Sequence, residues 1–396
     1  ARLRRNRQKY LPVSISVGTD GRESDNGVSY SYLRAPFRLC LNCGVSYGAR
    51  QVSDIGKVSS LGTEGRSTAT TILSLSSIRH LNREKSLPQK ARKLLSFTDN
   101  RQDASLQAGH FNDFVEIGLL RSALYKAAAD TGPAGLKHDE ITHTVFEALD
   151  LPLEMYAVDP EVKFRALEET KAALRNVIGY RLYHDLRRGW RVLSPNLEQC
   201  GLLEINYESL PELCEAEEEW QNCHSALLTA SPETRHAFSK VLLDLMRREL
   251  AIKVDFLESL FQERIRQQSN QRLISPWAFD ENERMLQAAI LFPRSIRRGI
   301  DYRGNLYLSS RSLFGQYLRR PNTFPDYRSK RTLDETEEII LQLLQTLRVA
   351  GLVEEVVPAE QEGDVPGYQL PGAAMRWIAG DGSQAFHDPL RVPTAS

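Results

Sequence analysis

The sequence predicts a mostly helical α+β protein, and three observations support that class. Alternating apolar residues within 10–50 indicate short strands, nearly all of 138–291 has helical character, and a helix–strand–loop–strand series follows from 333. The composition, 41% hydrophobic and 26% charged, is ordinary for a globular chain. At 396 residues the chain should hold about two to four domains.

The first predicted domain, 1–60, is small and rich in strands. The polar turn residues GTDGRESDNG separate two runs in which apolar and small polar residues alternate, which is typical of half-buried strands. The apolar members of these runs are Val13, Ile15 and Val17, then Val28, Tyr30 and Tyr32.

A C-x-x-C pair follows in the same segment. Cys40 and Cys43, with Gly44 after them, have the spacing of one knuckle of a zinc ribbon, but a structural zinc needs four ligands. The remaining candidates have no knuckle spacing, and a helical cysteine is more often a small buried apolar residue: Cys200, Cys214, Cys223 and His224. The pattern favours half a zinc site, with its second knuckle preceding Ala1, over a complete site or a redox pair.

The second predicted domain, 61–135, combines helices with one strand. A helix at 68–82 precedes a short apolar strand at 93–98 and a helix at 102–129, which ends at the TGPAG break. Six polar residues, Thr-Asp-Asn-Arg-Gln-Asp, join the strand to the second helix. A helix N-terminus with an arginine suits an anion, whereas Asp99 or Asn100 would equally serve as an ordinary cap. Local sequence leaves both interpretations open.

The third predicted domain, 136–300, is a helical insertion. Its longest helical stretches are 160–188 and 232–268. The exception is 189–209, where Pro195 and Gly201 interrupt extended segments.

The last predicted domain, 301–396, is a winged helix with an acidic tail. Asp334, with Glu337 three residues later, predicts a helix start as a variant of the capping box, and Gly351 predicts its end. The strand-like VEEVV, the loop AEQEGDVPG and the strand-like YQL follow. Helix, strand, loop and strand in this order indicate a winged helix over 305–380.

The charges of this last helix argue against sequence readout in a major groove. Its first turns are acidic, and Arg348 is its only cation, so DNA phosphates would repel the end that enters the groove. A packing, wedge or protein-contact role is therefore favoured. The acidic residues are Asp334, Glu335, Glu337 and Glu338.

The zero net charge conceals local asymmetry. Residues 1–50 carry nine Lys/Arg against three Asp/Glu, 292–331 carry ten against two, and 332–396 carry three against eleven. The segment 292–331 interleaves arginines with aromatics, which suits nucleic-acid binding, although an aromatic core with a solvated basic face is an equal alternative. The arginines that we single out as nucleic-acid contacts are Arg297, Arg298, Arg319 and Arg320.

Several classes of protein are disfavoured. No apolar run approaches the ~18 residues of a membrane-spanning helix, and no apolar signal core follows the basic N-terminus. Five cysteines, an odd number, indicate a reducing cytoplasm rather than a disulfide scaffold. The chain starts without methionine, as a processed product or a piece of a longer protein would. It also lacks a G-x-x-x-x-G-K-[ST] phosphate loop and an Asp-Glu box, so we do not expect it to hydrolyse ATP alone.

The segment KLLSFTDNRQDASLQAGHFNDF (93–114) resembles the first conserved strand and turn of the second RecA-like lobe in bacterial superfamily 2 DEAD/DEAH-box helicases. The branch is the large one with a cysteine-rich C-terminal region, whose relatives include DISARM- and Druantia-type phage-defence helicases and DNA-repair helicases. Further segments similar to this branch are FRLCLNCGVSYG (37–48), GRSTATTIL (65–73), RRGWRVLSPNLEQCGLL (187–203) and GYQLPGAAMRWIAGDG (367–382).

The resemblance implies that 61–135 is an incomplete RecA-like α/β element whose turn contacts nucleic-acid phosphates through Thr98, Asn100 and Arg101. Gln102 and Asp103 would fix the turn. The first lobe and the arginine-rich Q-x-x-G-R-x-G-R motif are absent, so ATP and Mg would be bound only by the intact helicase. Zinc would be bound only if a second knuckle joins Cys40 and Cys43.

The sequence thus predicts part of an ATP-dependent DNA helicase or translocase that is not catalytic alone. Its expected partners are DNA, the remaining lobes of the same protein and other defence or repair proteins. The alternative is a non-enzymatic DNA-binding or scaffold protein built on the winged helix. A phosphate loop encoded upstream would favour the helicase.

Overall fold

The structure is a computed structural model that describes residues 12–25, 27–33, 63–95, 101–187, 196–280, 283–293, 304–327, 329–359, 365–383 and 388–390. Within these ranges, side chains are not described for 63–69, 89, 101–110 and 112–115. The chain divides into two compact units, Ala1–Phe111 with His387–Ser396, and Asn112–Phe386. Helices and small sheets make up the described residues, which confirms the mostly helical α+β class.

The first unit contains an antiparallel hairpin of β1 (Val13–Val17) and β2 (Val28–Tyr32), as the alternation predicts. The loop between the strands folds back on β1, where the Ser24 amide donates to the Ser16 carbonyl at 2.9 Å. Gly27 is required here, because a Cβ atom would lie 2.3 Å from the Val17 carbonyl.

The helix predicted at 68–82 is also present, as α1 (Thr63–Arg83). The strand predicted at 93–98 is wrong for its described part. Residues 93–95 form no strand, and the Leu95 side chain is 78% exposed. The remainder of that strand lies outside the described residues.

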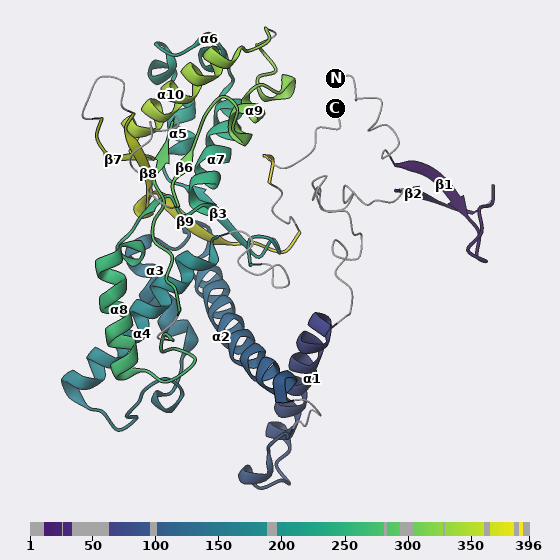
Figure 1. Ribbon diagram of the computed structural model, residues 1–396, viewed down its shortest axis with the longest axis vertical. Coiled ribbons are helices and arrows are strands. Elements are labelled where there is room, and N and C mark those ends of the chain that lie inside the picture. Colours follow the sequence, from purple (N-terminus) through teal and green to yellow (C-terminus); the bar gives the residue numbers. More distant parts are fainter. Residues whose placement is uncertain are drawn as a thin grey trace. The chain divides into compact units, whose positions relative to one another are not determined.

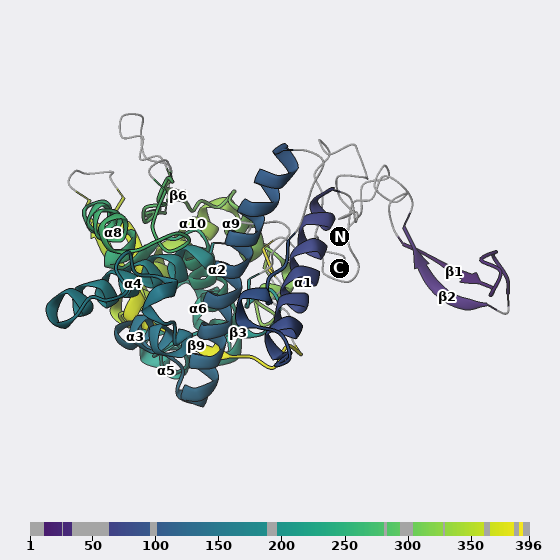
Figure 2. The same cartoon turned by 90° about the horizontal axis from the view of Figure 1, so that it is seen from below.

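The helix predicted at 102–129 is present as α2 (Arg101–Thr131), which is continuous in Figures 1 and 2. The α-helices described after it are α3 (His138–Leu149), α4 (Phe164–Asp185), α5 (Leu210–Glu215), α6 (Ser225–Leu228), α7 (Pro232–Arg248), α8 (Ser259–Arg272), α9 (Leu313–Leu318) and α10 (Leu333–Val349). The strands are β3 (Leu203–Tyr207), β4 (Ile252–Lys253), β5 (Leu291–Phe292), β6 (Leu306–Tyr307), β7 (Glu354–Val357), β8 (Gly367–Pro371) and β9 (Met375–Ala379).

A helical group of α3, α4 and α8 forms one part of the second unit (Figure 1). Its apolar faces meet on α4, where Leu174, Val177 and Ile178 are fully buried. Tyr183, near the end of α4, joins this group to the strands: its ring lies 5.8 Å from the Trp377 ring on β9, and its hydroxyl lies 2.6 Å from His138 Nδ1.

Two small sheets connect distant parts of the chain. β3 pairs antiparallel with β9, and β8 pairs parallel with β4 and antiparallel with both β5 and β7. β5 in turn pairs parallel with β6. Strands from either side of residue 300 therefore share one sheet within the same compact unit.

The helix predicted over 232–268 is wrong in its middle. α7 ends at Arg248, and Leu250 adopts φ +61°, a left-handed conformation. The Ala251 amide donates to the Met246 carbonyl at 2.8 Å and closes the helix end. Leu250 thus occupies the left-handed position that a glycine normally takes at a helix C-terminus. Leu250 tolerates this backbone because its side chain is 1% exposed, and its burial offsets a cost of about 1–2 kcal/mol. The prediction that nearly all of 138–291 is helical also fails at 283–290, which has no regular structure.

The end of α10 matches the prediction, whereas its start differs. Gly351 has φ +70°, and the Gly351 and Leu352 amides donate to the Arg348 and Leu347 carbonyls. The cap is Thr332 rather than Asp334: Thr332 Oγ1 accepts from the Glu335 amide at 3.2 Å, and Glu335 Oε2 accepts from the Thr332 amide at 2.7 Å. Thr332 and Glu335 therefore form the capping box that Asp334 and Glu337 were expected to form.

Candidate nucleic-acid interface

The predicted phosphate-binding turn lies mostly outside the described residues. Thr98 and Asn100 lie outside the described residues. The same holds, elsewhere in the chain, for Cys40, Cys43, Arg297 and Arg298. Arg101 is the first residue of α2, but its side chain is not described. The described backbone thus begins a 31-residue helix directly after the polar turn. Such an N-terminus offers unpaired N–H groups and the positive end of the helix dipole.

Arg319 and Arg320, the two described arginines of the predicted patch, lie at the corner between α9 and α10. Arg319 donates to the Ser310 carbonyl, and the Arg320 guanidinium lies 5.3 Å from the centre of the Tyr317 ring. Burial raises the pKa of Tyr317, while the Arg320 charge opposes the shift. Both arginines therefore contribute to packing within this corner.

Arg331 joins several parts of the same corner through its guanidinium group. It is 8% exposed, donates to the Leu318 and Arg320 carbonyls at 2.7 Å, and stacks 4.9 Å above the Phe324 ring. Burial lowers its pKa from the usual value, although a guanidinium remains charged near neutral pH.

Three of the six described aromatics of the basic segment are in the core. Phe292, Phe314 and Phe324 are at most 1% exposed, whereas Tyr307 is 39% exposed. In the described part of 292–331, packing therefore accounts for most of the arginine–aromatic mixture. Arg311 and Lys330 remain on the surface.

The start of α10 presents negative charge. Hydrogen bonds from the Thr332 backbone and side chain hold the pKa of Glu335 below its usual value, so it stays ionised at neutral pH. Glu337 accepts from Ser310 Oγ at 2.9 Å, and Arg348 is paired with Glu355 at 3.0 Å. This arrangement agrees with a helix that packs rather than one that enters a groove.

The described cysteines do not form a zinc site. Burial raises the pKa of Cys214 to about 12, and Cys223 Sγ lies 3.6 Å from Thr346 Oγ1. His224 Nδ1 accepts from the Ala226 amide at 3.1 Å and caps α6. Among the described residues no group of three or more metal-binding side chains comes together.

A buried ionic cluster beside β3 is the largest polar feature that the sequence did not predict. Arg247 on α7 donates two hydrogen bonds to Glu198, at 2.5 and 2.7 Å, and one to Asp244 at 2.9 Å. Tyr207 on β3 donates to Asp244 at 2.8 Å and accepts from Arg247 Nε at 3.2 Å. Lys240 adds a bond to the Ile205 carbonyl at 2.6 Å. The sequence signal was a group of charged residues at helical spacing on α7: Lys240, Asp244, Arg247 and Arg248.

The electrostatics of this cluster fit a structural role. Burial raises the pKa of Asp244, but the charges of Arg247 and Lys240 lower it more, so the net pKa lies below the usual value of 3.8. Burial raises the pKa of Tyr207 far above its usual value of 10.0. Neither group exchanges protons near neutral pH, so the cluster is unsuited to acid–base catalysis.

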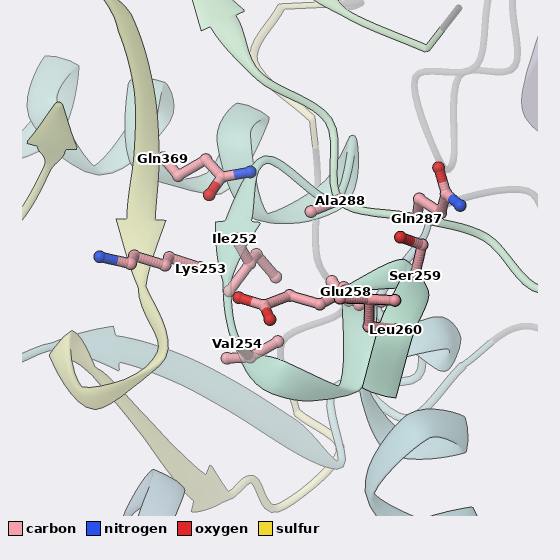
Figure 3. Close-up of a pocket in the computed structure, with 10 residues that line it drawn as sticks. Ile252, Lys253, Val254, Glu258, Ser259, Leu260, Gln287, Ala288 and Gln369 are labelled. Atoms are coloured by element: carbon pink, nitrogen blue, oxygen red, sulfur yellow. The ribbon is translucent and has the colours of Figure 1, made fainter. Parts of the chain in front are cut away.

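An open pocket of about 360 Å³ lies between β4, the start of α8 and the segment around Ala288 (Figure 3). Its walls combine apolar side chains from 252–260 with the Glu258 carboxylate and the amides of Gln287 and Gln369. Gln369 is held by a hydrogen bond to the Ala289 carbonyl at 2.8 Å. No histidine or cysteine lines the pocket, and Glu258 is the one carboxylate among its lining residues, so the pocket does not offer the four ligands of a structural zinc site.

Comparisons with protein-family models, curated proteins and solved structures give no match to this chain. Within the described residues, none of the helices has the length and apolar character that crossing a membrane requires.

Proposed function

We propose that this chain is part of an ATP-dependent DNA helicase or translocase and contributes contacts to the nucleic-acid backbone without being catalytic alone. The observation that carries the proposal is the position of the polar turn. A 31-residue helix begins at Arg101, directly after the Thr-Asp-Asn residues that resemble the helicase turn. A helix N-terminus next to hydroxyl, amide and guanidinium groups suits phosphate without base specificity.

In this proposal Thr98, Asn100 and Arg101 contact phosphates, and Arg297, Arg298, Arg319 and Arg320 supply further positive charge. α10 with the β7–β8 pair forms a winged helix that packs or wedges. Cys40 and Cys43 hold zinc with a second knuckle preceding Ala1. ATP and Mg belong to the remaining lobes of the same cytoplasmic protein, and other defence or repair proteins are its further partners.

The alternative function is a non-enzymatic DNA-binding or scaffold protein. Within this alternative, the packing of Arg319, Arg320 and Arg331 in the α9–α10 corner favours a scaffold over a DNA-binding protein, because these arginines already have partners within the chain. The sequence encoded on either side of the chain separates the two: a phosphate loop upstream and an arginine-finger motif downstream support the helicase, and flanking stop codons support the scaffold.

The test of the proposal is the full-length protein carrying Arg101→Ala. We expect a loss of DNA-stimulated ATPase activity and a decrease of about one in the slope of log affinity against log salt, because one phosphate contact is removed. Alanine is a good helix former, so α2 should persist. The matched control is Arg165→Ala, since Arg165 is 92% exposed and paired with Glu169 one helical turn away. If both variants keep the activity and salt slope of the unmodified protein, the turn does not contact phosphate.

A further inference from the structure

The pocket between β4 and the start of α8 has a buried apolar wall. Ile252 on β4, together with Val254 and Leu257, lines the pocket, and each of these residues is at most 4% exposed. The volume of about 360 Å³ lies at the small end of the range for ligand pockets, roughly 300–1,000 Å³. The wall therefore suits a small ligand with a short apolar part.

Gln369 presents a buried amide oxygen to this pocket. The residue is 8% exposed, and its side-chain nitrogen donates to the Ala289 carbonyl at 2.8 Å. Because only the nitrogen of an amide can donate to a carbonyl, the Gln369 oxygen must face the other way, which is toward Ile252 in Figure 3. None of the described residues donates a hydrogen bond to this oxygen. A ligand with an N–H group would satisfy it.

Glu258 supplies a second acceptor, which carries a full charge. It is exposed and occupies the N-cap position of α8, but its side chain does not cap the helix. A side chain at this position usually accepts from the first amides of the helix. Figure 3 shows instead that the Glu258 carboxylate extends across the pocket toward Ile252. Among the described residues it has neither an ion-pair partner nor a hydrogen-bond donor.

The other charges near the pocket leave it electronegative. Lys253 is the one cation among the lining residues, and its ammonium group is paired with Glu354 at 2.5 Å. In Figure 3 this ammonium points away from Glu258. The α8 dipole contributes only about half a positive charge at this end of the helix, so the charge of Glu258 is not balanced. An anion is therefore disfavoured, and a cation would be held by an acceptor on either side.

We propose that this pocket binds a primary alkylammonium group, which donates to the Glu258 carboxylate and the Gln369 amide oxygen. An ammonium group has three N–H donors, and with a pKa of about 10.4 it is charged at neutral pH. The alkyl chain packs on Ile252, Val254 and Leu257. The same chemistry has two sources, a free small amine and a lysine side chain of another protein. The site is separate from the proposed nucleic-acid contacts and does not depend on them.

The experiment is isothermal titration calorimetry on the full 396-residue chain. The probes are n-butylammonium, n-butanol, which keeps the alkyl chain and a donor but has no charge, and Nα-acetyl-lysine N-methylamide. The test variant is Glu258→Gln, which keeps the shape of the side chain and removes no cap or ion pair described in the fold. The matched control is Glu263→Gln, because Glu263 is also exposed on α8 but does not line the pocket.

We expect n-butylammonium to bind the unmodified chain and the Glu263 variant equally. Glu258→Gln should weaken this binding about tenfold or more, because a hydrogen bond between two charged groups is lost. A second variant, Ala288→Leu, should also weaken it, since the larger side chain occupies the pocket without changing its charge. For n-butanol we expect an affinity at least about tenfold lower than for n-butylammonium.

Three results would overturn the inference: equal affinity for n-butylammonium and n-butanol, equal losses in the Glu258 and Glu263 variants, or no binding of either amine across the millimolar range. The lysine derivative distinguishes the two sources of the ammonium group. If it binds as tightly as n-butylammonium or more tightly, the ligand is a lysine side chain of a protein partner. If it binds more weakly, the ligand is a free amine, and both results support the ammonium site.

Discussion

Apolar groups usually lie inside a protein and charged groups outside. The β1–β2 hairpin exposes apolar side chains, whereas the ionic cluster on α7 buries charged ones. In the cluster, Arg247 has a fully buried side chain and every charge is met by a partner within the chain. In the hairpin, Tyr30 and Val28 are more than half exposed, and their neighbours on the same face are also apolar. The comparison teaches that buried charges compensated by nearby partners stabilise a fold, whereas the exposed apolar residues of the hairpin have no such compensation among the described residues.

The largest expected effect concerns Arg247. Arg247→Met should lower the free energy of unfolding by about 3–5 kcal/mol, because Glu198 and Asp244 would remain buried without their counter-charge. Urea denaturation measures this difference. The control Arg165→Met removes an exposed i, i+4 pair and should cost only about 0.3–0.5 kcal/mol. Equal effects of the two substitutions would mean that the cluster is solvated and that the contrast with the hairpin is lost.

A smaller effect is expected from the pH dependence of His138. Burial lowers the pKa of this histidine below 6.5, and its Nδ1 lies 2.6 Å from the Tyr183 hydroxyl. As the pH falls, the unfolded chain therefore binds a proton before the folded chain does. The stabilisation is complete above pH 6.5 and is lost as the pH falls through the folded pKa, at no more than about 1.4 kcal/mol per pH unit.

The check is urea denaturation at pH 7.5 and pH 5.5. His138→Gln should flatten the slope of stability between these values, and the matched control is His143→Gln, at an exposed position of the same helix. His236, whose pKa burial also lowers, contributes equally in all three proteins. An unchanged slope in the His138 variant would show that this group stays solvated in the folded chain.

The smallest expected effect is in the hairpin. Tyr30→Ser should change the unfolding free energy of the Asn112–Phe386 unit by no more than about 0.5 kcal/mol, since substitutions at exposed positions rarely matter more. Thermal unfolding followed by tryptophan fluorescence reports on that unit, because Trp220, Trp277 and Trp377 lie in it and are buried. A large shift would mean that Tyr30 contributes to the stability of the Asn112–Phe386 unit, and the contrast with the ionic cluster would be lost.

Elements that depend on neighbouring residues could be predicted from the sequence. The hairpin followed from its alternation, and the end of α10 at Gly351 from the freedom of glycine at positive φ. The cap of α10 was displaced because Thr332 and Asp334 both have side chains that can cap, and only packing selects one.

Elements that depend on distant residues could not be predicted. The end of α7 at Leu250 requires that the Leu250 side chain be buried, and the local sequence does not reveal this burial. The ionic cluster joins Glu198, Tyr207 and Arg247 from three separate segments. The basic segment 292–331 was ambiguous for the same reason, since an arginine that packs on a ring and one that is free to bind a phosphate look alike in sequence. For the candidate site, the sequence therefore predicts the residue types and the start of a helix. It does not predict which charged side chains already have partners within the fold.

The pairing of β3 with β9 also has a consequence for how the protein is made. β9 lies between β3 and Leu136: Trp377 pairs with Ile205 and exchanges two backbone hydrogen bonds with Leu136. On the ribosome, both of these segments emerge long before Met375–Ala379. Until then the edge of β3 is uncovered, and such an edge can pair with another chain. β9, the last strand among the described residues of this unit, therefore covers the β3 edge late, so this edge stays open to pairing with another chain until translation has nearly reached the end of the unit.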